Sequence, residues 1–561
     1  MSCATATPPV HDVSGHDGRL ARLVLVSALV LLALVPRVAM SQLRPVLCTD
    51  AVFFLERAAA FERGEFDAGL ARIGLNPYSL LLALLHTPYL DWESVGRLWS
   101  LALAALAVIP LFALTRRLFG VAPGVIASLL YAVQPELIEW SPEIIRDPTF
   151  WFLLLATLYV SHVAACAERR QLALYALAGA LLALAGLTRF EGWFLVLPLG
   201  WWTVAYGRQP VAWRAMAVRL GLALSMTPLC LVLINVTLLA GHDRWEWGRF
   251  DPLILALRWT GDVVEAPPLQ AIAAPAVATA NGRDAVALEN AEKRPSIKAM
   301  CWGMAHTLVQ SAHPLYLLTM TGGLWSARHR NFLRDQAPLW ILAAVNLVAV
   351  WIYFWNHHEI NARYMLLLVL VGLPYAGLGL LQAATLVARV VRNESTQRRL
   401  TFAGVATMLA VVAVIGCHDA LTSGYQSRFL KADLGRWIRA RFGAQRMVLC
   451  SENLERLVGY YARARHASIS PDASPREALA RIDTLEPDLL VLWLPQSSEQ
   501  ELLEHFQGVD GARFDIYLGD DLPPSCRDAA VLARRPESRS ENANGSGPAG
   551  VSLSDPARPL Y

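Results

Sequence analysis

Long apolar runs separated by short polar loops occupy most of the chain between residues 19 and 420. A helix needs about 20 such residues to cross roughly 30 Å of hydrocarbon. The pattern therefore predicts a mainly α, polytopic transmembrane protein. About eleven spans are expected, near residues 19–40, 95–115, 121–138, 148–166, 171–188, 191–206, 216–240, 301–325, 337–355, 364–388 and 401–420.

Three polar segments interrupt or follow these runs, at residues 41–94, 241–300 and 421–536. Inside the first, the run NPYSLLLALLHTPYL is too short to span and is bracketed by Pro77 and Pro88. This pattern predicts a helix that lies at the membrane face. Residues 1–18 form a short polar tail, and the composition of residues 537–561, rich in Ser, Asn, Gly and Pro, predicts disorder.

The third polar segment, 421–536, has the pattern of a small α/β domain. RMVLCSE, DLLVLWLP and the weaker ARFDIYLGD are apolar runs of strand length, separated by helical patterns. Strands that alternate with helices predict a parallel sheet. No G-x-G-x-x-G follows a strand, so no nucleotide site is expected. Cys450 and Cys526 both fall here and either pair or stay free thiols.

Arginines are distributed unevenly between the predicted loops. With a cytoplasmic N-terminus, every inside loop contains at least two arginines, whereas the short outside loops near 140–147, 189 and 356–363 contain one each. This is the positive-inside pattern of membrane proteins. It predicts a multi-pass protein of the cytoplasmic (inner) membrane whose N-terminus is cytoplasmic and whose C-terminal domain is extracytoplasmic (periplasmic).

Composition supports the membrane assignment. Charged residues make up 17% of the 561, below the ~25% of soluble domains, while 55% are hydrophobic and the mean hydropathy is +0.38. These values exclude a soluble single domain, a disordered chain and a fibrous repeat. The formal net charge is only +3, so nucleic acid is not an expected partner.

The first candidate for chemistry is an acidic residue beyond the first span. A carboxylate held at the membrane edge is costly and is therefore a functional candidate. Asp50 lies ten residues after that span, at the start of an amphipathic helical pattern in CTDAVFFLERAAAFERGEF. A purely structural role is also open, because Asp is a common N-cap residue.

Two further acidic motifs lie in outside loops. In SPEIIRDPTF, Glu143 and Asp147 are four positions apart and would face the same way on one helical turn, with Arg146 beside them. In LTRFEG, Arg189 and Glu191 stand at the junction of two spans. The structural alternatives are a solvated loop with Asp147 as N-cap, and a simple charge pair at the membrane edge.

The motif NHHEINARY, at 356–364, contains His358, Glu359 and Arg363. Adjacent histidines cannot share one helical face and H-E-x-x-H is absent, so no metal site is predicted. The guanidinium fork of Arg363 suits a phosphate held at the membrane surface. The alternative for Arg363 is a snorkelling side chain at a helix end. Together with Arg363, His358 and Glu359 are candidate substrate-binding residues.

All of these polar motifs are predicted on the outer side of the membrane. A transporter should instead show polar residues near the bilayer midplane and two related halves, and no such repeat is visible. The layout favours a reaction at the outer membrane surface with part of the substrate in the lipid. A lipid or solute transporter and a non-catalytic envelope assembly protein are the rival interpretations.

At this point the sequence resembles a known class, the bacterial polytopic GT-C glycosyltransferases. The resemblance is to the branch of protein O-mannosyltransferases, lipid A aminoarabinose transferases and galacturonosyltransferases of lipopolysaccharide cores. It rests on the order of TDAVFFLERAAAFERGEF, GRLWSLALAALAVIPLFALTRRLFG, AVQPELIEWSPEIIRDPTFWFLLLA, LAGLTRFEGWFLVLPL and NARYMLLLVLVGLP, followed by the C-terminal segment that begins FLKADLGRWIRARFG.

The resemblance implies a polyprenyl-phosphate-linked sugar as donor and an acceptor hydroxyl. Asp50 would then be the catalytic base of an inverting single displacement. Asp147, with Glu143, would bind the acceptor or position Asp50, and Arg363 would neutralise the departing lipid phosphate. Arg146 and Arg189 are secondary candidates for that work, and Glu191 is a further substrate-binding candidate.

The sequence does not select the sugar or the acceptor, which can be a protein Ser or Thr, a lipopolysaccharide core, or another envelope glycan or lipid. No cofactor other than the donor is implied, and a divalent-cation requirement stays open. Membrane lipids are expected partners because most of the chain lies in the bilayer.

Overall fold

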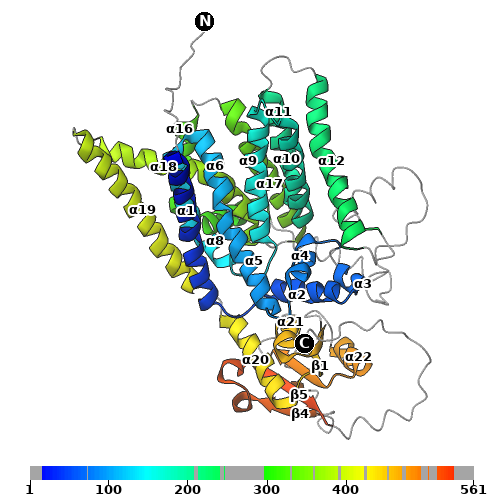
Figure 1. Ribbon diagram of the computed structural model, residues 1–561. Helices are drawn as coiled ribbons and strands as arrows, with labels where there is room; N and C mark the ends of the chain where they lie inside the picture. The colour runs from blue at the N-terminus through cyan, green and yellow to red at the C-terminus, as the bar shows by residue number, and fades with distance from the viewer. Residues whose placement is uncertain are drawn as a thin grey trace.

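The computed structural model describes residues 16–71, 74–206, 213–239, 245–246, 296–328, 332–357, 360–389, 393–422, 426–451, 454–469, 475–493, 503–504 and 514–535. Most of the expected tail 1–18, most of the polar segment 241–300 and the whole of 537–561 lie outside these residues. Figure 1 shows a large helical bundle with a smaller α/β domain below one of its ends.

Apolar helices, nearly all of them long, form the bundle. They are α1 (His16–Leu43), α5 (Trp92–Leu106), α6 (Val108–Phe119), α7 (Val121–Val133), α9 (Asp147–Cys166), α10 (Gln171–Thr188), α11 (Val196–Ala205), α12 (Trp213–Thr237), α15 (Ile297–Ala312), α16 (Pro314–Ala327), α17 (Ala337–His357), α18 (Leu366–Ala388) and α19 (Glu394–Thr422). A main apolar core joins most of them and includes the buried aromatic residues Tyr131, Trp151 and Trp202.

Within the described residues, eight helical segments are long and apolar enough to cross a membrane, with α5 and α6 counted as one. The other three expected spans are shorter or interrupted. α7 has 13 residues and gives way to the short α8 (Pro135–Trp140). Residues 190–206 are divided between the 3-10 helix η1 (Phe190–Leu195) and α11. The expected span 301–325 breaks at His313, where φ is 59° and Pro314 begins α16.

Helices α16 and α18 pack closely because glycines line their contact. A Cβ atom at Gly323 would clash with the carbonyl oxygen of Tyr375, and one at Gly379 with that of Thr319. Small residues of this kind let membrane helices approach backbone to backbone. Gly322, next to Gly323 on α16, faces open space.

We therefore expect Gly379→Ala to destabilise the bundle. The added methyl group meets backbone, which cannot move aside cheaply, so the cost should be about 1–3 kcal/mol. The melting temperature in detergent should fall for Gly379→Ala and stay unchanged for the control Gly322→Ala. Equal melting temperatures for the two variants would show that the α16–α18 contact has room for a methyl group at Gly379.

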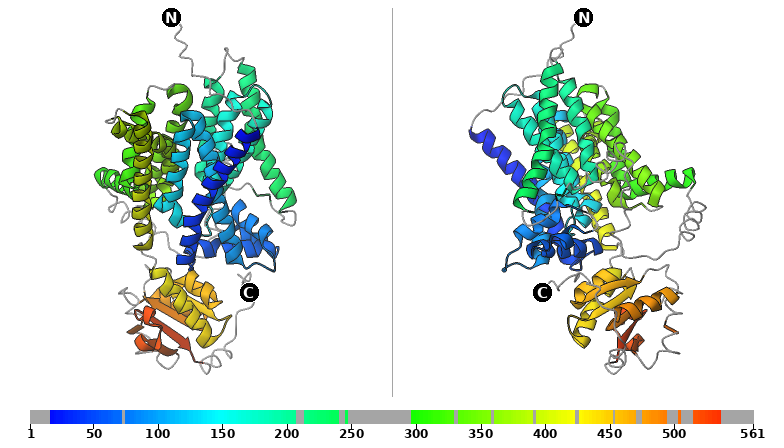
Figure 2. Two further views of the ribbon diagram at one scale, coloured as in Figure 1. Left: turned by 60° about the vertical axis from the view of Figure 1, so that its left-hand side comes forward. Right: turned by 90° about the vertical axis from the view of Figure 1, so that its right-hand side faces the viewer.

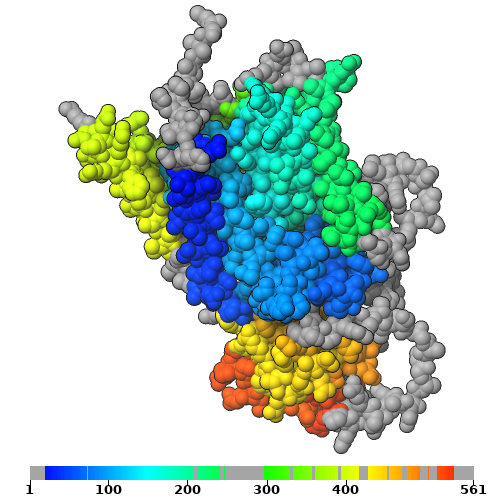
Figure 3. All heavy atoms as spheres, viewed as in Figure 1, coloured from blue at the N-terminus to red at the C-terminus, as the bar shows by residue number. Residues whose placement is uncertain are grey.

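Helices α1 and α19 lie on the outside of the bundle, as Figure 3 shows for α1. Only 22% of the apolar window of α1 and 6% of that of α19 is buried. α1 is nevertheless tied to the bundle by Arg37, which is fully buried and donates to Ser141 Oγ at 2.9 Å and to the Tyr131 carbonyl at 3.1 Å. Arg37 thereby satisfies carbonyls at the C-terminal end of α7.

A layer of short helices covers the end of the bundle nearest the C-terminal domain. It consists of α2 (Thr49–Glu62), α3 (Phe66–Leu70) and α4 (Pro77–Leu85). The expected surface helix after residue 76 is α4, which begins where Asn76 Oδ1 accepts a hydrogen bond from Tyr78 N at 3.0 Å. Figures 1 and 2 show this layer between the bundle and the C-terminal domain.

The C-terminal domain begins with α20 (Gln426–Phe442) and contains a five-stranded sheet in the order β2-β1-β3-β5-β4. Its strands are β1 (Met447–Ser451), β2 (Arg465–Ile469), β3 (Leu489–Trp493), β4 (Phe514–Leu518) and β5 (Ala529–Arg534), with α21 (Glu455–Ala462) and α22 (Pro475–Leu485) between them.

The expected parallel sheet is only half right. β1 pairs in parallel with β2 and β3, but β5 runs antiparallel to both β3 and β4. β2 and β5 were not expected as strands, and their addition makes the sheet mixed. β4 and β5 are connected without an intervening long helix, so they return antiparallel. Cys450 and Cys526 are buried free thiols.

The C-terminal domain docks on the layer of short helices through α21 and β2. Tyr461 Oη accepts from Leu47 N at 3.0 Å, and Tyr460 Oη donates to Glu93 Oε1 at 3.1 Å. Leu457 joins an apolar cluster with Val52 and Leu55 of α2. The domain is therefore attached directly to the helix that carries Asp50.

Candidate active site

Most of the polar residues singled out in the sequence come together at the end of the bundle that faces the C-terminal domain. Four helix ends meet there. Asp50 lies in the first turn of α2, Asp147 is the first residue of α9, Arg189 and Glu191 lie where α10 passes into η1, and Arg363 lies in the 3-10 helix η4 (Ala362–Met365). Neither aspartate is the N-cap residue, which is Cys48 in α2 and Arg146 in α9.

The first ion pair of the site joins Asp50 to Arg363. Arg363 Nη1 donates to Asp50 Oδ2 at 2.7 Å, across 313 positions of sequence. The Asp50 side chain is 43% exposed and that of Arg363 21% exposed. Arg363 Nε is buried and has no hydrogen-bond partner among the described residues. A half-exposed carboxylate thus stands beside a guanidinium that has an unused N–H group.

The second charged cluster is more buried than the first, and in it one arginine bonds to two carboxylates. Arg189 bonds to Asp147 through Nη1 and to Glu191 through both Nε and Nη2, the latter at 2.6 Å. The side chains of Arg189 and Asp147 are only 6% and 4% exposed. Burial alone would raise the pKa of Glu191, but the neighbouring Arg189 guanidinium lowers it to about 2. Glu191 is therefore ionised at neutral pH.

The ring of Tyr364 lies beside both arginines, so the Asp50–Arg363 pair and the Arg189 cluster are neighbours. The ring centroid of Tyr364 lies 5.8 Å from the guanidinium carbon of Arg363 and 5.9 Å from that of Arg189. Asp147 and Arg189 are both close enough to act electrostatically on Arg363. The site thus holds two guanidinium groups and three carboxylates in one neighbourhood.

Glu143 lies nearby but does not face the same way as Asp147. Residues 141–146 form turns and not a helix, so the four-residue spacing does not align the two side chains. Glu143 instead bonds to Arg428 Nη1 of α20 at 2.5 Å, and its side chain is 4% exposed. Burial, Glu143 and Asp50 together raise the pKa of the Cys48 thiol, which places both acids near Cys48.

Hydrogen bonds from the bundle hold η4 and therefore Arg363 in place. Asn361 Oδ1 accepts from Arg363 N at 3.1 Å, and Ser311 Oγ of α15 donates to the Ala362 carbonyl at 2.8 Å. Gln134, the N-cap of α8, donates to the Ser311 carbonyl at 2.5 Å. The Arg363 backbone is thus connected to the loop that leads to Glu143 and Asp147.

Of the remaining predicted residues, one lies at the site and two lie outside the described residues. Arg146 is half-buried and acts electrostatically on Glu191, so it belongs to the site. His358 and Glu359 lie outside the described residues. Within the part of the chain that the structure describes, no group of three or more His, Cys, Asp or Glu side chains is arranged to hold a metal ion.

Two residues of the site were not among the expected ones. Tyr364 directly follows Arg363 in the Arg-Tyr motif, so its sequence position was an available signal. Arg428 lies 285 positions from Glu143, in a helix whose charge pattern is that of a solvated surface. Only the tertiary structure brings Arg428 to the site.

Residues 79–235 match the family model of dolichyl-phosphate-mannose-protein mannosyltransferase. This range contains Glu143, Asp147, Arg189 and Glu191, and excludes Asp50 and Arg363. None of the curated protein sequences compared with the chain matches it significantly.

Solved structures of ArnT and of an oligosaccharyltransferase are similar to nearly the whole chain. ArnT from Cupriavidus metallidurans bound to undecaprenyl phosphate has a TM-score of 0.55 and 14% identity, covering 95% of this chain and 100% of that one. Apo ArnT has the same TM-score and identity, covering 92% and 98%. The apo oligosaccharyltransferase of Archaeoglobus fulgidus has a TM-score of 0.53 and 14% identity, covering 92% and 74%.

These comparisons agree with the membrane-spanning helices and the small C-terminal sheet. They confirm the resemblance and the fold class expected from the sequence. The chain is a multi-pass membrane protein with the GT-C glycosyltransferase fold.

Proposed function

We propose that this protein is a membrane glycosyltransferase that moves a sugar from a polyprenyl-phosphate donor to an acceptor hydroxyl. The observation that carries the proposal is the Asp50–Arg363 pair at the membrane face, in which Arg363 Nε is unused. The likeness to an ArnT structure bound to undecaprenyl phosphate supports the donor class, as does the dolichyl-phosphate in the name of the matching family.

Arg363 is suited to bind the donor phosphate. Its Nη1 holds Asp50, and its Nε can donate to a phosphate oxygen, which is a strong charge-assisted bond. Arg189 adds positive charge nearby, although Asp147 and Glu191 neutralise it. A donor phosphate that competes for Arg363 weakens the hydrogen bond from Arg363 to Asp50. Donor binding therefore frees the Asp50 carboxylate to act as the base.

The transfer itself is a single displacement. The acceptor oxygen forms a bond to the anomeric carbon while the bond from that carbon to the phosphate oxygen breaks, and its electron pair goes to the phosphate. Asp50 takes the acceptor proton, and the configuration of the sugar inverts. Arg363 stabilises the negative charge that develops on the leaving phosphate.

The other acids and arginines position these groups. Asp147 and Glu191 hold Arg189 beside Tyr364, and Arg146 lies close enough to share in phosphate binding. Because Asp147 is buried against Arg189, we assign it to positioning and not to direct contact with the acceptor. His358 and Glu359, beyond the described residues, remain candidates for contact with substrate.

The proposal includes an orientation. The excess of arginines in the predicted inside loops supports a cytoplasmic N-terminus. In this orientation the site and the C-terminal domain lie on the outer face of the inner membrane. The acceptor is then an envelope lipid, glycan or protein. This arrangement suits a donor whose lipid stays in the bilayer while the sugar reaches the polar layer.

The purified full-length protein in proteoliposomes tests this function directly. A panel of undecaprenyl-phosphate sugars is supplied with envelope extract as acceptor, and free undecaprenyl phosphate and new glycoconjugates are measured by mass spectrometry. We expect at least one donor to be consumed with formation of a matching glycoconjugate. Movement of a donor across the bilayer without its consumption would favour a transporter and contradict the proposal.

Arg363→Lys should weaken donor binding while it keeps the positive charge. An ammonium group cannot hold Asp50 and a phosphate with the fixed geometry of the fork, so kcat/KM for the donor should fall about 10- to 100-fold. The measurement is initial rate against donor concentration. Arg63→Lys, which changes an exposed pair with Glu65 at the far end of α2, is the control. An unchanged donor dependence would remove Arg363 from phosphate binding.

Arg428 should act as a positioning residue that connects the C-terminal domain to the site. Arg428→Gln leaves Glu143 buried without its partner, so kcat should fall about tenfold while the donor KM stays unchanged. Arg428→Gln combined with Glu143→Gln should recover most of the rate, because no buried charge is left unpaired. Arg439→Gln, at an exposed position of the same helix, is the control.

If the activity of Arg428→Gln falls only as much as the amount of folded protein falls, so that kcat per folded molecule is normal, that result would contradict this positioning role. So would failure of the double variant to recover, because recovery is what separates the charge effect from lost packing.

A further inference from the structure

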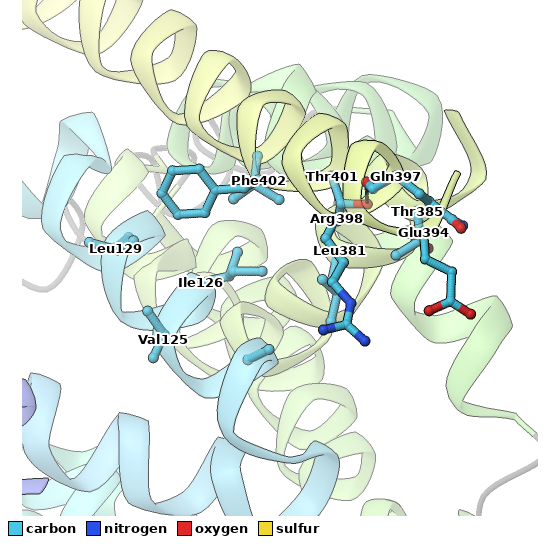
Figure 4. A pocket seen from close by; sticks show the side chains of 12 residues that line it. Val125, Ile126, Leu129, Leu381, Thr385, Glu394, Gln397, Arg398, Thr401 and Phe402 are labelled. Atoms are coloured by element: carbon cyan, nitrogen blue, oxygen red, sulfur yellow. Dashed lines mark hydrogen bonds between the residues drawn. The ribbon is translucent and has the colours of Figure 1, made fainter. Parts of the chain in front are cut away.

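A second feature lies at the opposite end of the bundle from Asp50 and Arg363. There, α7, α18 and α19 enclose an open cavity of about 690 Å³ (Figure 4). The start of α7, the end of α18 and the start of α19 line it. None of these lining residues belongs to the site described above.

The cavity has an apolar wall and a polar rim. Ile126 and Leu129 of α7, Leu381 of α18 and Phe402 of α19 contribute apolar side chains. Arg398 provides the positive charge at the rim, on the first turns of α19. A surface of this kind fits a molecule with a hydrocarbon chain and an anionic head.

Arg398 is available to such a ligand. Figure 4 shows its guanidinium extending from α19 toward α7, while the carboxylate of Glu394 lies to one side. Glu394 precedes Arg398 by one helical turn, but no ion pair or hydrogen bond joins Arg398 to any residue that the structure describes. The positive charge is therefore directed into the cavity without an internal counter-ion.

We propose that this cavity binds an anionic glycerophospholipid of the leaflet opposite the active site. Its phosphate bonds to Arg398, and its acyl chains lie against the apolar wall between α7 and α19. Arg389 at the end of α18 adds positive charge at the same membrane edge. Basic residues at this depth attract anionic lipid headgroups.

The glycosyl donor is not the expected occupant. α18 connects the two ends of the bundle, and its 23 residues span about 35 Å at 1.5 Å per residue. A phosphate at Arg398 is thus about one membrane thickness away from Arg363. This separation makes the inference independent of the proposed function.

A lipid at this position has a structural consequence for α19. Only 6% of the apolar window of α19 is buried, so protein contacts hold it weakly against the bundle. A bound acyl chain fills the space between α19 and α7 and adds contacts that the protein does not supply. The lipid therefore acts as a packing element for the last span before the C-terminal domain.

Native mass spectrometry of the full-length protein in detergent tests the proposal. The probes are phosphatidylglycerol and phosphatidylethanolamine of equal chain length, with undecaprenyl phosphate as a third, competing lipid. We expect one phosphatidylglycerol per chain to be retained in about fivefold preference. Arg398→Gln should abolish the preference, and Arg399→Gln, one position along and outside the cavity lining, should keep it. Leu129→Trp, which fills the apolar wall, should reduce the retention of both lipids.

Equal losses for Arg398→Gln and Arg399→Gln would overturn the proposal, because they would show only a general attraction to surface charge. Retention of several lipids without preference would overturn it as well and indicate ordinary boundary lipid. Preferential retention of undecaprenyl phosphate over phosphatidylglycerol would reassign the cavity to the donor. Folding of Leu129→Trp is not required, since the two arginine variants decide the outcome.

Discussion

Asp50→Asn is expected to lower kcat for sugar transfer by about 10²–10⁴-fold, the range that a positioned general base contributes. Asparagine has nearly the same shape and can still accept a hydrogen bond from Arg363, so the local structure should persist. It cannot take a proton from the acceptor hydroxyl. Initial rates at saturating donor, measured with protein of confirmed membrane insertion, give the effect.

The matched control is Asp67→Asn, an exposed aspartate in the first turn of the neighbouring helix α3, which should leave the rate unchanged. The donor KM of Asp50→Asn should stay within a few-fold of wild type. A rate near that of wild type would remove Asp50 from the chemistry. A large rise in donor KM with normal kcat would also contradict the role of base and assign Asp50 to orienting Arg363.

Arg189→Met should produce the largest loss of stability, about 3–5 kcal/mol. The guanidinium bonds to both Asp147 and Glu191, and the change leaves one buried and one partly buried carboxylate without their main counter-ion. Methionine fills much of the space, so the loss comes mainly from charge. Thermal unfolding in detergent measures it, with Arg63→Met at the exposed pair with Glu65 as control.

A triple variant distinguishes the charge of Arg189 from its packing. Arg189→Met combined with Asp147→Asn and Glu191→Gln should recover much of the stability, because no buried charge is left. Failure to recover would mean that Arg189 acts through its contacts with the Phe150 and Tyr364 rings, which lie 5.7 and 5.9 Å away.

The pH dependence gives an independent check of the Arg189 cluster. The pKa of Glu191 is lowered to about 2 in the folded protein, below the roughly 4.3 of an unfolded chain. The stabilisation from this pair is therefore complete above about pH 5 and is lost as the pH falls toward 2. The stability difference between wild type and Arg189→Met should shrink over the same range.

The spans could be predicted from sequence because the bilayer imposes one strong requirement, a helix of about 20 apolar residues. The requirement for an unbroken helix of about 20 apolar residues is weaker for a helix that is surrounded by other helices and not by lipid. α7 has only 13 residues, and His313 and Pro314 break the segment between α15 and α16. Hydropathy alone does not register such interruptions, because the flanking residues stay apolar.

The site could be predicted only where its residues come at helix ends within recognisable motifs. Asp147, Arg189 and Arg363 were found this way, since a charge at the end of an apolar run stands out. Arg428 was not, because a charge in a polar helix is ordinary until folding places it against Glu143. The orientation of Glu143 was wrong for a related reason, since turns replaced the helix that the spacing assumed.

The Asp50–Arg363 contact also sets an order of events during synthesis. Asp50 is translated early, and its partner lies 313 residues later in the chain. At about 5–20 residues per second, roughly 15–60 s pass before Arg363 has been translated. Arg428 follows later still. A chain that ends before residue 363 contains neither Arg363 nor Arg428, so under the proposed function we expect such a truncated product to be inactive.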